Sequence, residues 1–204
     1  MGANQLGDRQ PTGIERLFLA LFPPVGAVDH LRRRLGREPA VPAERRIAPK
    51  RLHVTLAFLG PVPEERRVRL LRELSDCSHG LAAPQLLRLA GAGAFGRGVA
   101  WVGLRAADDD APRALQADVR ALRRACRSAR CQPDDSLRWR PHLTIARIRP
   151  SDPTAARGLA TALSDYRGPD WRPASYTLVA STGGPRPEYS RLADFPLPPV
   201  ETEV

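Results

Sequence analysis

Two short segments of the sequence carry a histidine and a threonine separated by one apolar residue. The first pair is His53 and Thr55, and the second is His142 and Thr144. If each segment is a β-strand, its His and Thr share one face while the apolar neighbours point the other way, because side chains alternate with period two. Each strand would then present a proton-transfer group beside a hydroxyl donor. Two such strands predict the two halves of one active site.

Paired histidines suit general acid–base catalysis. One neutral imidazole would take a proton from water, and one imidazolium would give a proton to a leaving oxygen. The threonine hydroxyls can bind a phosphate held between them. On a 2′,3′-cyclic phosphate, water would attack phosphorus in line, one ribose oxygen would leave and a phosphomonoester would remain. Arginines would stabilise the developing negative charge.

Other chemistries have weaker support in the sequence. Neither motif has a second histidine or a carboxylate at chelating spacing, so we predict no metal site and no cofactor. A serine nucleophile flanked by glycines between a strand and a helix is also missing.

Four arginines near the motifs are candidates for substrate binding. By strand parity Arg51, Arg138 and Arg140 lie on the same face as the histidines, whereas Arg147 points away unless its strand ends or bends. Surface salt bridges are the alternative role for all four.

The motif strands need a scaffold, and hydrophobic periodicity predicts one. Residues 91–98 are rich in glycine and are expected to form a hairpin loop. The six arginines between 113 and 130 are expected to form a solvated helix face, with RNA contact as the alternative. We expect strands at 16–22, 51–60, 84–90, 99–104, 138–148, 174–181 and 188–194, and helices at 24–36, 64–75, 111–130 and 153–166.

These elements repeat along the chain. His142 follows His53 by 89 residues (142 − 53). Shifting the helices 24–36 and 64–75 and the strands 84–90 and 99–104 by the same interval places each on an element of its own type. The spacing predicts two β-α-β-α-β units related by a pseudo-twofold axis, with the histidine strands meeting at one groove.

Composition sets the broad class. The chain has 204 residues and is 42% hydrophobic, which suits one domain without a membrane span. The three cysteines do not form a disulfide framework, and the N-terminus lacks the apolar core of a signal peptide, so we expect a cytoplasmic protein. A net charge of +10 favours a polyanionic partner, although arginine supplies all but one of the 32 basic residues.

The motifs and their surroundings resemble the 2H phosphoesterase superfamily, in particular its bacterial and archaeal RNA 2′,3′-cyclic phosphodiesterases, once called 2′-5′ RNA ligases. The resemblance spans about residues 15–195 and rests on Arg-Leu-Phe-Leu-Ala at 16–20, Leu-His-Val-Thr-Leu-Ala-Phe-Leu-Gly at 52–60, Trp-Val-Gly-Leu at 101–104 and Pro-His-Leu-Thr-Ile-Ala-Arg at 141–147.

The resemblance implies metal-independent hydrolysis of RNA or nucleotide 2′,3′-cyclic phosphates to 2′-phosphomonoesters. It assigns His53 as the proton donor and His142 as the proton acceptor, and it supports Arg147 as a phosphate ligand. The nearly symmetric motifs alone leave this division of labour open. Two alternatives remain. The protein could be a nucleotide- or RNA-binding module with little turnover, or a phosphodiesterase for another cyclic phosphate or a 2′-5′ linkage.

The sequence therefore predicts an α+β fold of two pseudo-symmetric lobes. Each lobe would be a mainly antiparallel sheet with helices on its outer side, and the active-site groove would lie between them. We expect one domain over residues 1–204, with a flexible arm at 1–14 and a proline-rich tail at 196–204. The expected protein is a monomer without membrane association that binds RNA 3′ ends or nucleotides carrying a 2′,3′-cyclic phosphate. The predicted substrate ligands are Thr55, Thr144, Arg147, Arg51 and Arg140.

Overall fold

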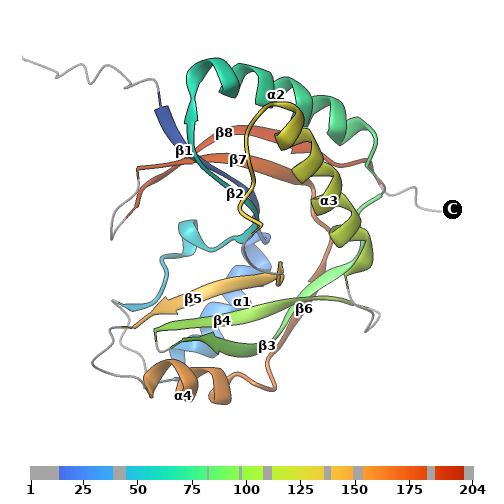
Figure 1. The fold of residues 1–204 in the computed structure, drawn as a ribbon. Helices are drawn as coiled ribbons and strands as arrows, with labels where there is room; N and C mark the ends of the chain where they lie inside the picture. The colour runs from blue at the N-terminus through green and yellow to red at the C-terminus, as the bar shows by residue number, and fades with distance from the viewer. Residues whose placement is uncertain are drawn as a thin grey trace, which may run out of the picture.

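The computed structural model describes residues 14–38, 45–81, 83–96, 98–107, 112–135, 139–148, 154–182 and 187–199. Within these ranges the chain forms four α-helices and eight strands (Figure 1). The strands are β1 (Ile14–Leu21), β2 (Val54–Pro63), β3 (Leu87–Phe95), β4 (Val99–Ala106), β5 (His142–Arg147), β6 (Arg167–Trp171), β7 (Ser175–Ser181) and β8 (Tyr189–Pro196). The helices are α1 (Val25–Gly36), α2 (Glu64–His79), α3 (Arg113–Ser128) and α4 (Ala155–Ala162), and a short 3₁₀ turn, η2 (Pro49–Arg51), precedes β2.

All strand pairings between these elements are antiparallel, in the order β6-β3-β4-β5-β2-β1-β7-β8. The two motif strands, β2 and β5, are central neighbours, yet they pair only at Val54 and Leu143. The sheet is therefore two four-stranded halves that meet along a short seam. This arrangement confirms the predicted α+β fold with two lobes.

The lobes do not coincide with the two halves of the sequence. β1 and β2 share one half of the sheet with the C-terminal strands β7 and β8, whereas β4 and β5 share the other half with β3 and β6. Shifting by 89 residues matched the strand at 99–104 with the strand at 188–193. The positions of these two strands in the sheet show that this match is wrong. β4 lies beside a motif strand, so its spatial counterpart is β1, while β8 is an edge strand.

Helices cover the outer sides of both lobes. α2 and α3 pack against each other and against β2 and β8, and α1 and α4 pack against β6, β3 and β4. Figure 1 shows α2 and α3 over one half of the sheet and α1 and α4 against the other. The inner surfaces of the two halves are thereby left free to form a cleft.

β1 connects the first histidine to the core through buried side chains on both of its faces. Its residues from Leu17 to Leu21 are buried on both faces, as expected for a continuous apolar run. Leu17, Leu19 and Leu21 belong to the main core beneath the helices. Phe18 and Ala20 instead form a small cluster with Val179 on the opposite face of the sheet. This second cluster is the apolar floor beneath the first histidine.

Several element boundaries differ from the predicted ones. The glycine-rich segment is strand as far as Phe95, and Gly91, at φ 62°, occupies a bulge in β3. α4 is only eight residues long. β6 was not predicted, because its sequence Arg-Gly-Pro-Asp-Trp contains two residues that weaken strands. Proline is tolerated there because β6 is an edge strand.

The predicted N-terminal arm falls mostly on residues 1–13, which lie outside the described residues, and β1 begins at Ile14. At the other end, Leu197 is buried and its amide donates to the carbonyl of Ala174 at 2.9 Å. Residues 200–204 lie outside the described residues. None of the described helices is long and apolar enough to cross a membrane.

Candidate active site

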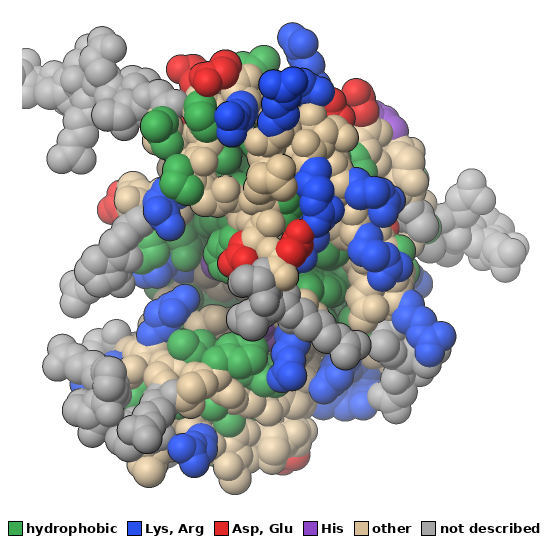
Figure 2. All heavy atoms as spheres, viewed as in Figure 1, with side chains coloured by type: hydrophobic (Ala, Val, Ile, Leu, Met, Phe, Trp, Pro, Cys, Tyr) green, Lys and Arg blue, Asp and Glu red, His purple; other side chains and the backbone are tan. Residues whose placement is uncertain are grey.

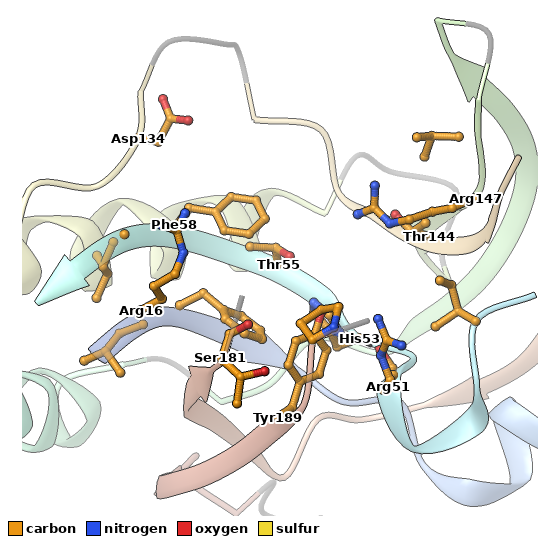
Figure 3. Close-up of a pocket in the computed structure, with 18 of the residues that line it drawn as sticks. Arg16, Arg51, His53, Thr55, Phe58, Asp134, Thr144, Arg147, Ser181 and Tyr189 are labelled. Carbon is orange, nitrogen blue, oxygen red and sulfur yellow. Dashed lines mark hydrogen bonds between the residues drawn. The ribbon is translucent and has the colours of Figure 1, made fainter. Parts of the chain in front are cut away.

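A cleft of about 1020 Å³ lies between the inner surfaces of the two lobes. Both predicted histidines and both predicted threonines line it, as do Arg51 and Arg147. Figure 3 shows Thr55, His53 and Arg51 along one side, with Thr144 and Arg147 facing them from the other lobe. The structure thus brings two segments 89 residues apart to one site, because β2 and β5 are neighbours in the sheet.

Both imidazoles are anchored in the same way. His53 Nδ1 lies 2.7 Å from the carbonyl oxygen of Arg51, and His142 Nδ1 lies 2.7 Å from the carbonyl oxygen of Arg140. A carbonyl only accepts hydrogen bonds, so each Nδ1 carries the proton and donates it. Nε2 is then the ring nitrogen left for the cleft. Each histidine can accept a proton when neutral and donate one when charged.

Both motif strands contain a β-bulge directly after the threonine. In β5, Thr144 pairs with Trp101 and Ala146 with Ala100, which leaves Ile145 as the extra residue. In β2, Thr55 pairs with Ala20 and Ala57 with Leu19, which leaves Leu56 as the extra residue. A bulge reverses the alternation of side chains beyond it.

The bulges decide which residues reach the cleft five positions after each histidine. Arg147, which strict parity directs away from the histidine face, lines the cleft because of the bulge at Ile145. Phe58 occupies the same position after His53 and also lines the cleft, with 56% of its surface exposed. The two lobes therefore place an arginine and an aromatic ring at matching positions.

His53 is enclosed by aromatic side chains. Its ring centroid lies 5.0 Å from that of Phe18, 5.4 Å from that of Tyr189 and 5.9 Å from that of Phe22. Burial lowers the pKa of His53, and the hydrogen bond to the Arg51 carbonyl opposes this effect. The positive charges of Arg51, His142 and Arg147 lower the pKa further.

His142 has a different aromatic environment. The ring of Phe95 meets it edge-on at 4.8 Å, and Trp101 lies 6.1 Å away. Burial is again the main cause of a lowered pKa, the hydrogen bond to the Arg140 carbonyl opposes it, and Arg147 adds to the lowering. Arg147 thus acts on both histidines, whereas the charge of Arg51 acts on His53 alone.

The arginines predicted as substrate ligands lie in two different pockets. Arg51 lines the cleft with its guanidinium 5.3 Å from the centre of the Tyr189 ring, and Arg147 lines the opposite side. Arg140 does not line the cleft. It lies in a separate groove of about 500 Å³ beside α3, together with Arg105, Arg120 and Trp139. Arg138 lies outside the described residues.

Two of the arginines on α3 have specific partners. Arg123 and Arg127 pair with Asp135, and Arg123 additionally donates to the carbonyl of Leu56. These contacts connect α3 to the motif strand β2 and to the segment that follows α3. Figure 2 shows basic side chains along the side of the molecule that α2 and α3 form. Apart from Arg123, the arginines of α3 are exposed to solvent.

Several residues of the cleft were missed by sequence reasoning. Tyr189 comes from β8, more than 130 residues from His53. Phe95 lies in the segment predicted as a loop, and Arg16 lies at the start of β1. The alternation of β1 could have indicated Arg16, because it shares a face with Phe18. No local pattern indicates Tyr189.

Of the cleft-lining residues that the structure describes, the ionisable ones are the two histidines, Tyr189, three arginines and one carboxylate, Asp134. Among the described residues no three His, Cys, Asp or Glu side chains cluster in a way that could hold a metal ion. The remaining histidines have partners elsewhere: His30 with the Tyr166 hydroxyl and His79 with the Ser75 carbonyl. The site is thus a basic, aromatic cleft with two proton-transfer groups.

Comparison with known proteins gives consistent matches. A family model described as the 2′-5′ RNA ligase superfamily matches residues 19–184. A protein of Geobacillus stearothermophilus named RNA 2′,3′-cyclic phosphodiesterase is 33% identical over 153 residues, which cover 71% of this chain and 45% of that protein. The chain therefore spans about half the length of the curated relative that it matches.

Solved structures agree in fold. E. coli LigT in its apo form superposes with a TM-score of 0.68 at 25% identity, covering 91% of this chain and 99% of that one. Its complex with 3′-AMP gives 0.67 with the same identity and coverage. A protein of Thermus thermophilus gives 0.67 at 26% identity, covering 89% and 97% of the two chains.

Proposed function

This chain belongs to the 2′-5′ RNA ligase superfamily, and we propose that it is an enzyme that hydrolyses 2′,3′-cyclic phosphates at RNA ends to 2′-phosphomonoesters. The resemblance to 2H phosphoesterases that the motifs carry is confirmed. The observation that carries the proposal is the matched pair of histidines, each anchored through Nδ1 with Nε2 left for one cleft.

In the proposed reaction the cyclic phosphate lies between the histidines. His142 Nε2, neutral, accepts a proton from water as the water oxygen attacks phosphorus. His53 Nε2, protonated, gives its proton to the 3′ oxygen as the bond from phosphorus to that oxygen breaks. Attack and departure occur on opposite sides of phosphorus, which suits a two-sided site. The product carries a 2′-phosphate and a free 3′ hydroxyl.

The remaining ligands would stabilise the charge that develops on the phosphoryl oxygens. The hydroxyls of Thr55 and Thr144 share the cleft with the histidines, and the guanidinium groups of Arg147 and Arg51 are charge-assisted donors. The bound phosphate would also raise the pKa of both imidazoles, because an anion favours the charged form. Protonated His53 would thereby be retained in the complex although burial lowers its pKa in the free protein.

The test is hydrolysis of adenosine 2′,3′-cyclic phosphate and of a short RNA with the same end, in the presence of a chelator. We expect ring opening, with 2′-phosphate as the product identified by phosphorus NMR. A 3′-phosphate product would mean that the 2′ oxygen, and not the 3′ oxygen, leaves phosphorus. Binding without turnover at every pH would support a nucleotide-binding module instead, and cleavage of a 2′-5′ linked dinucleotide alone would point to a different diester.

A further inference from the structure

The three arginines of the cleft lie at two ends. Arg51 and Arg147 lie together near His53 and Thr144, whereas Arg16 lies at the opposite end, beside Phe58 and Ser181 (Figure 3). The proposed chemistry uses the first end and the space between the histidines. It leaves the Arg16 end without a role.

Arg16 is held in place by the backbone but not by a counter-ion. It pairs with Ser181 of β7 on one side and Pro61 of β2 on the other, so its position is set by two neighbouring strands. Its side chain is exposed, and it forms no ion pair within the described part of the chain. Its neighbour in sequence, Glu15, pairs instead with Arg67.

One carboxylate also lines the cleft. It belongs to Asp134, whose backbone amide donates to the Phe58 carbonyl at 2.8 Å. Figure 3 shows Asp134 on a segment separate from β1, which carries Arg16. The cleft as a whole keeps an excess of positive charge, with three arginines against one carboxylate among its described lining residues.

The cleft lies at the upper end of the size range of small-molecule pockets. Pockets that enclose a drug-sized ligand span about 300–1000 Å³, and this cleft reaches about 1020 Å³. Phe58 lies beside Arg16 with 56% of its surface exposed, and it is a platform on which a base can stack. A cation and an aromatic platform in one groove are the components of a single-stranded nucleic-acid subsite.

We propose that the Arg16 end is a second phosphate subsite, which binds the phosphodiester one nucleotide upstream of the reactive end. The proposal rests on the proposed function for where the reactive phosphate lies. Arg16 binds the upstream phosphate, and Phe58 stacks on the base between the two phosphates. The protein is then selective for RNA ends over cyclic mononucleotides.

The test compares adenosine 2′,3′-cyclic phosphate, which has no upstream phosphate, with the dinucleotide ApA bearing the same cyclic end. In the wild type kcat/KM is higher for the dinucleotide. Arg16→Ala lowers the dinucleotide value about tenfold more than the mononucleotide value, because a charge-assisted contact is lost. Arg16→Lys keeps most of the preference. Arg157→Ala, at an exposed arginine on the outer helix α4, is the matched control and changes neither value.

A binding measurement separates this proposal from the proposed function. The dissociation constant of the 2′-phosphorylated dinucleotide is measured by calorimetry at several salt concentrations, with no turnover required. Arg16→Ala weakens binding and reduces the slope of log K against log salt by about 0.7, as one lost phosphate contact predicts. Equal loss for both substrates, or an unchanged salt slope, overturns the subsite. Absence of hydrolysis with an intact Arg16 effect on binding overturns only the proposed reaction.

Discussion

The two halves of the candidate active site share one layout and differ in the side chains that surround it. In both, a histidine donates Nδ1–H to the carbonyl two residues earlier, a threonine follows on the same face, and a bulge turns the fifth residue towards the cleft. The first half ends in Phe58 and packs His53 among Phe18, Phe22 and Tyr189. The second ends in Arg147.

In the proposed reaction the shared part would serve proton transfer, and the divergent part would serve the recognition of an asymmetric substrate. A nucleoside 2′,3′-cyclic phosphate has an anionic phosphate at one end and a flat aromatic base at the other, so an arginine and an aromatic ring at matching positions would hold its two ends. The same contrast appears two residues before each histidine. Arg51 lines the cleft, while its counterpart Arg140 lies in the groove beside α3.

The largest expected effect comes from the shared part. His53→Ala and His142→Ala should each lower kcat for a 2′,3′-cyclic nucleotide by roughly 10²–10⁴-fold, the usual contribution of a positioned acid or base. Single-turnover kinetics measure the loss, and thermal unfolding monitors the fold. His79→Ala, at an exposed histidine on α2, is the matched control. Full activity in either active-site variant would remove that histidine from the mechanism.

Substitutions of Arg147 and Phe58, each five residues after a histidine, should change different kinetic parameters. Arg147→Ala should lower kcat/KM by about 10–100-fold, since a charge-assisted contact to the phosphate is lost. Phe58→Ala should act mainly on KM, by about tenfold, because stacking on a base holds substrate and transition state alike. Steady-state kinetics on the same substrate measure both. Identical effects on kcat would contradict the division of roles between the lobes.

The paired arginines before the histidines offer a sharper comparison. Arg51→Ala should lower kcat/KM by about tenfold, because Arg51 lines the cleft beside His53, where the proposed reaction places the phosphate, and lies over Tyr189. Arg140→Ala should change it by less than about twofold, since the carbonyl that anchors His142 belongs to the backbone and is retained. A large loss in Arg140→Ala would mean that the substrate also occupies the groove beside α3.

The smallest expected effect is a shift in pH dependence. The pKa values of both histidines lie below the ordinary 6.5, because both are buried. With one histidine charged and one neutral, kcat/KM should trace a bell whose centre lies on the acid side of that value. The charge of Arg51 lowers the pKa of His53 and not that of His142, so Arg51→Ala should move only the limb that belongs to His53, towards higher pH.

That shift would also order the two titrations. Movement of the acidic limb would show that His53 has the lower pKa of the pair, and movement of the alkaline limb would show that it has the higher one. Arg147→Ala should move both limbs upward, because its charge lowers both pKa values. A profile that is flat through the histidine range would contradict the acid–base pair. The comparison needs only residual activity in the two variants.

The sequence by itself determined which histidines and threonines line the cleft, and the strands that carry them. The alternation of His53, Val54 and Thr55, repeated at 142–144, places polar groups on one face and apolar groups on the other, and this is a local property of any strand. The apolar run at 16–22 and the helical stripes likewise predicted the lobes and their covering helices. Local periodicity therefore sufficed for the histidines and threonines.

Only the tertiary structure decided the rest. A bulge depends on the register between neighbouring strands, so the orientation of Arg147 and Phe58 follows from the pairing of β5 with β4 and of β2 with β1. Tyr189 reaches His53 because β7 and β8 join the lobe of β1 and β2, a pairing between distant segments. Arg51 ends the 3₁₀ turn η2 and lines the cleft, whereas Arg140 lies in a stretch without regular structure and lines the groove beside α3. Each outcome depends on contacts far apart in sequence, which the local pattern does not contain.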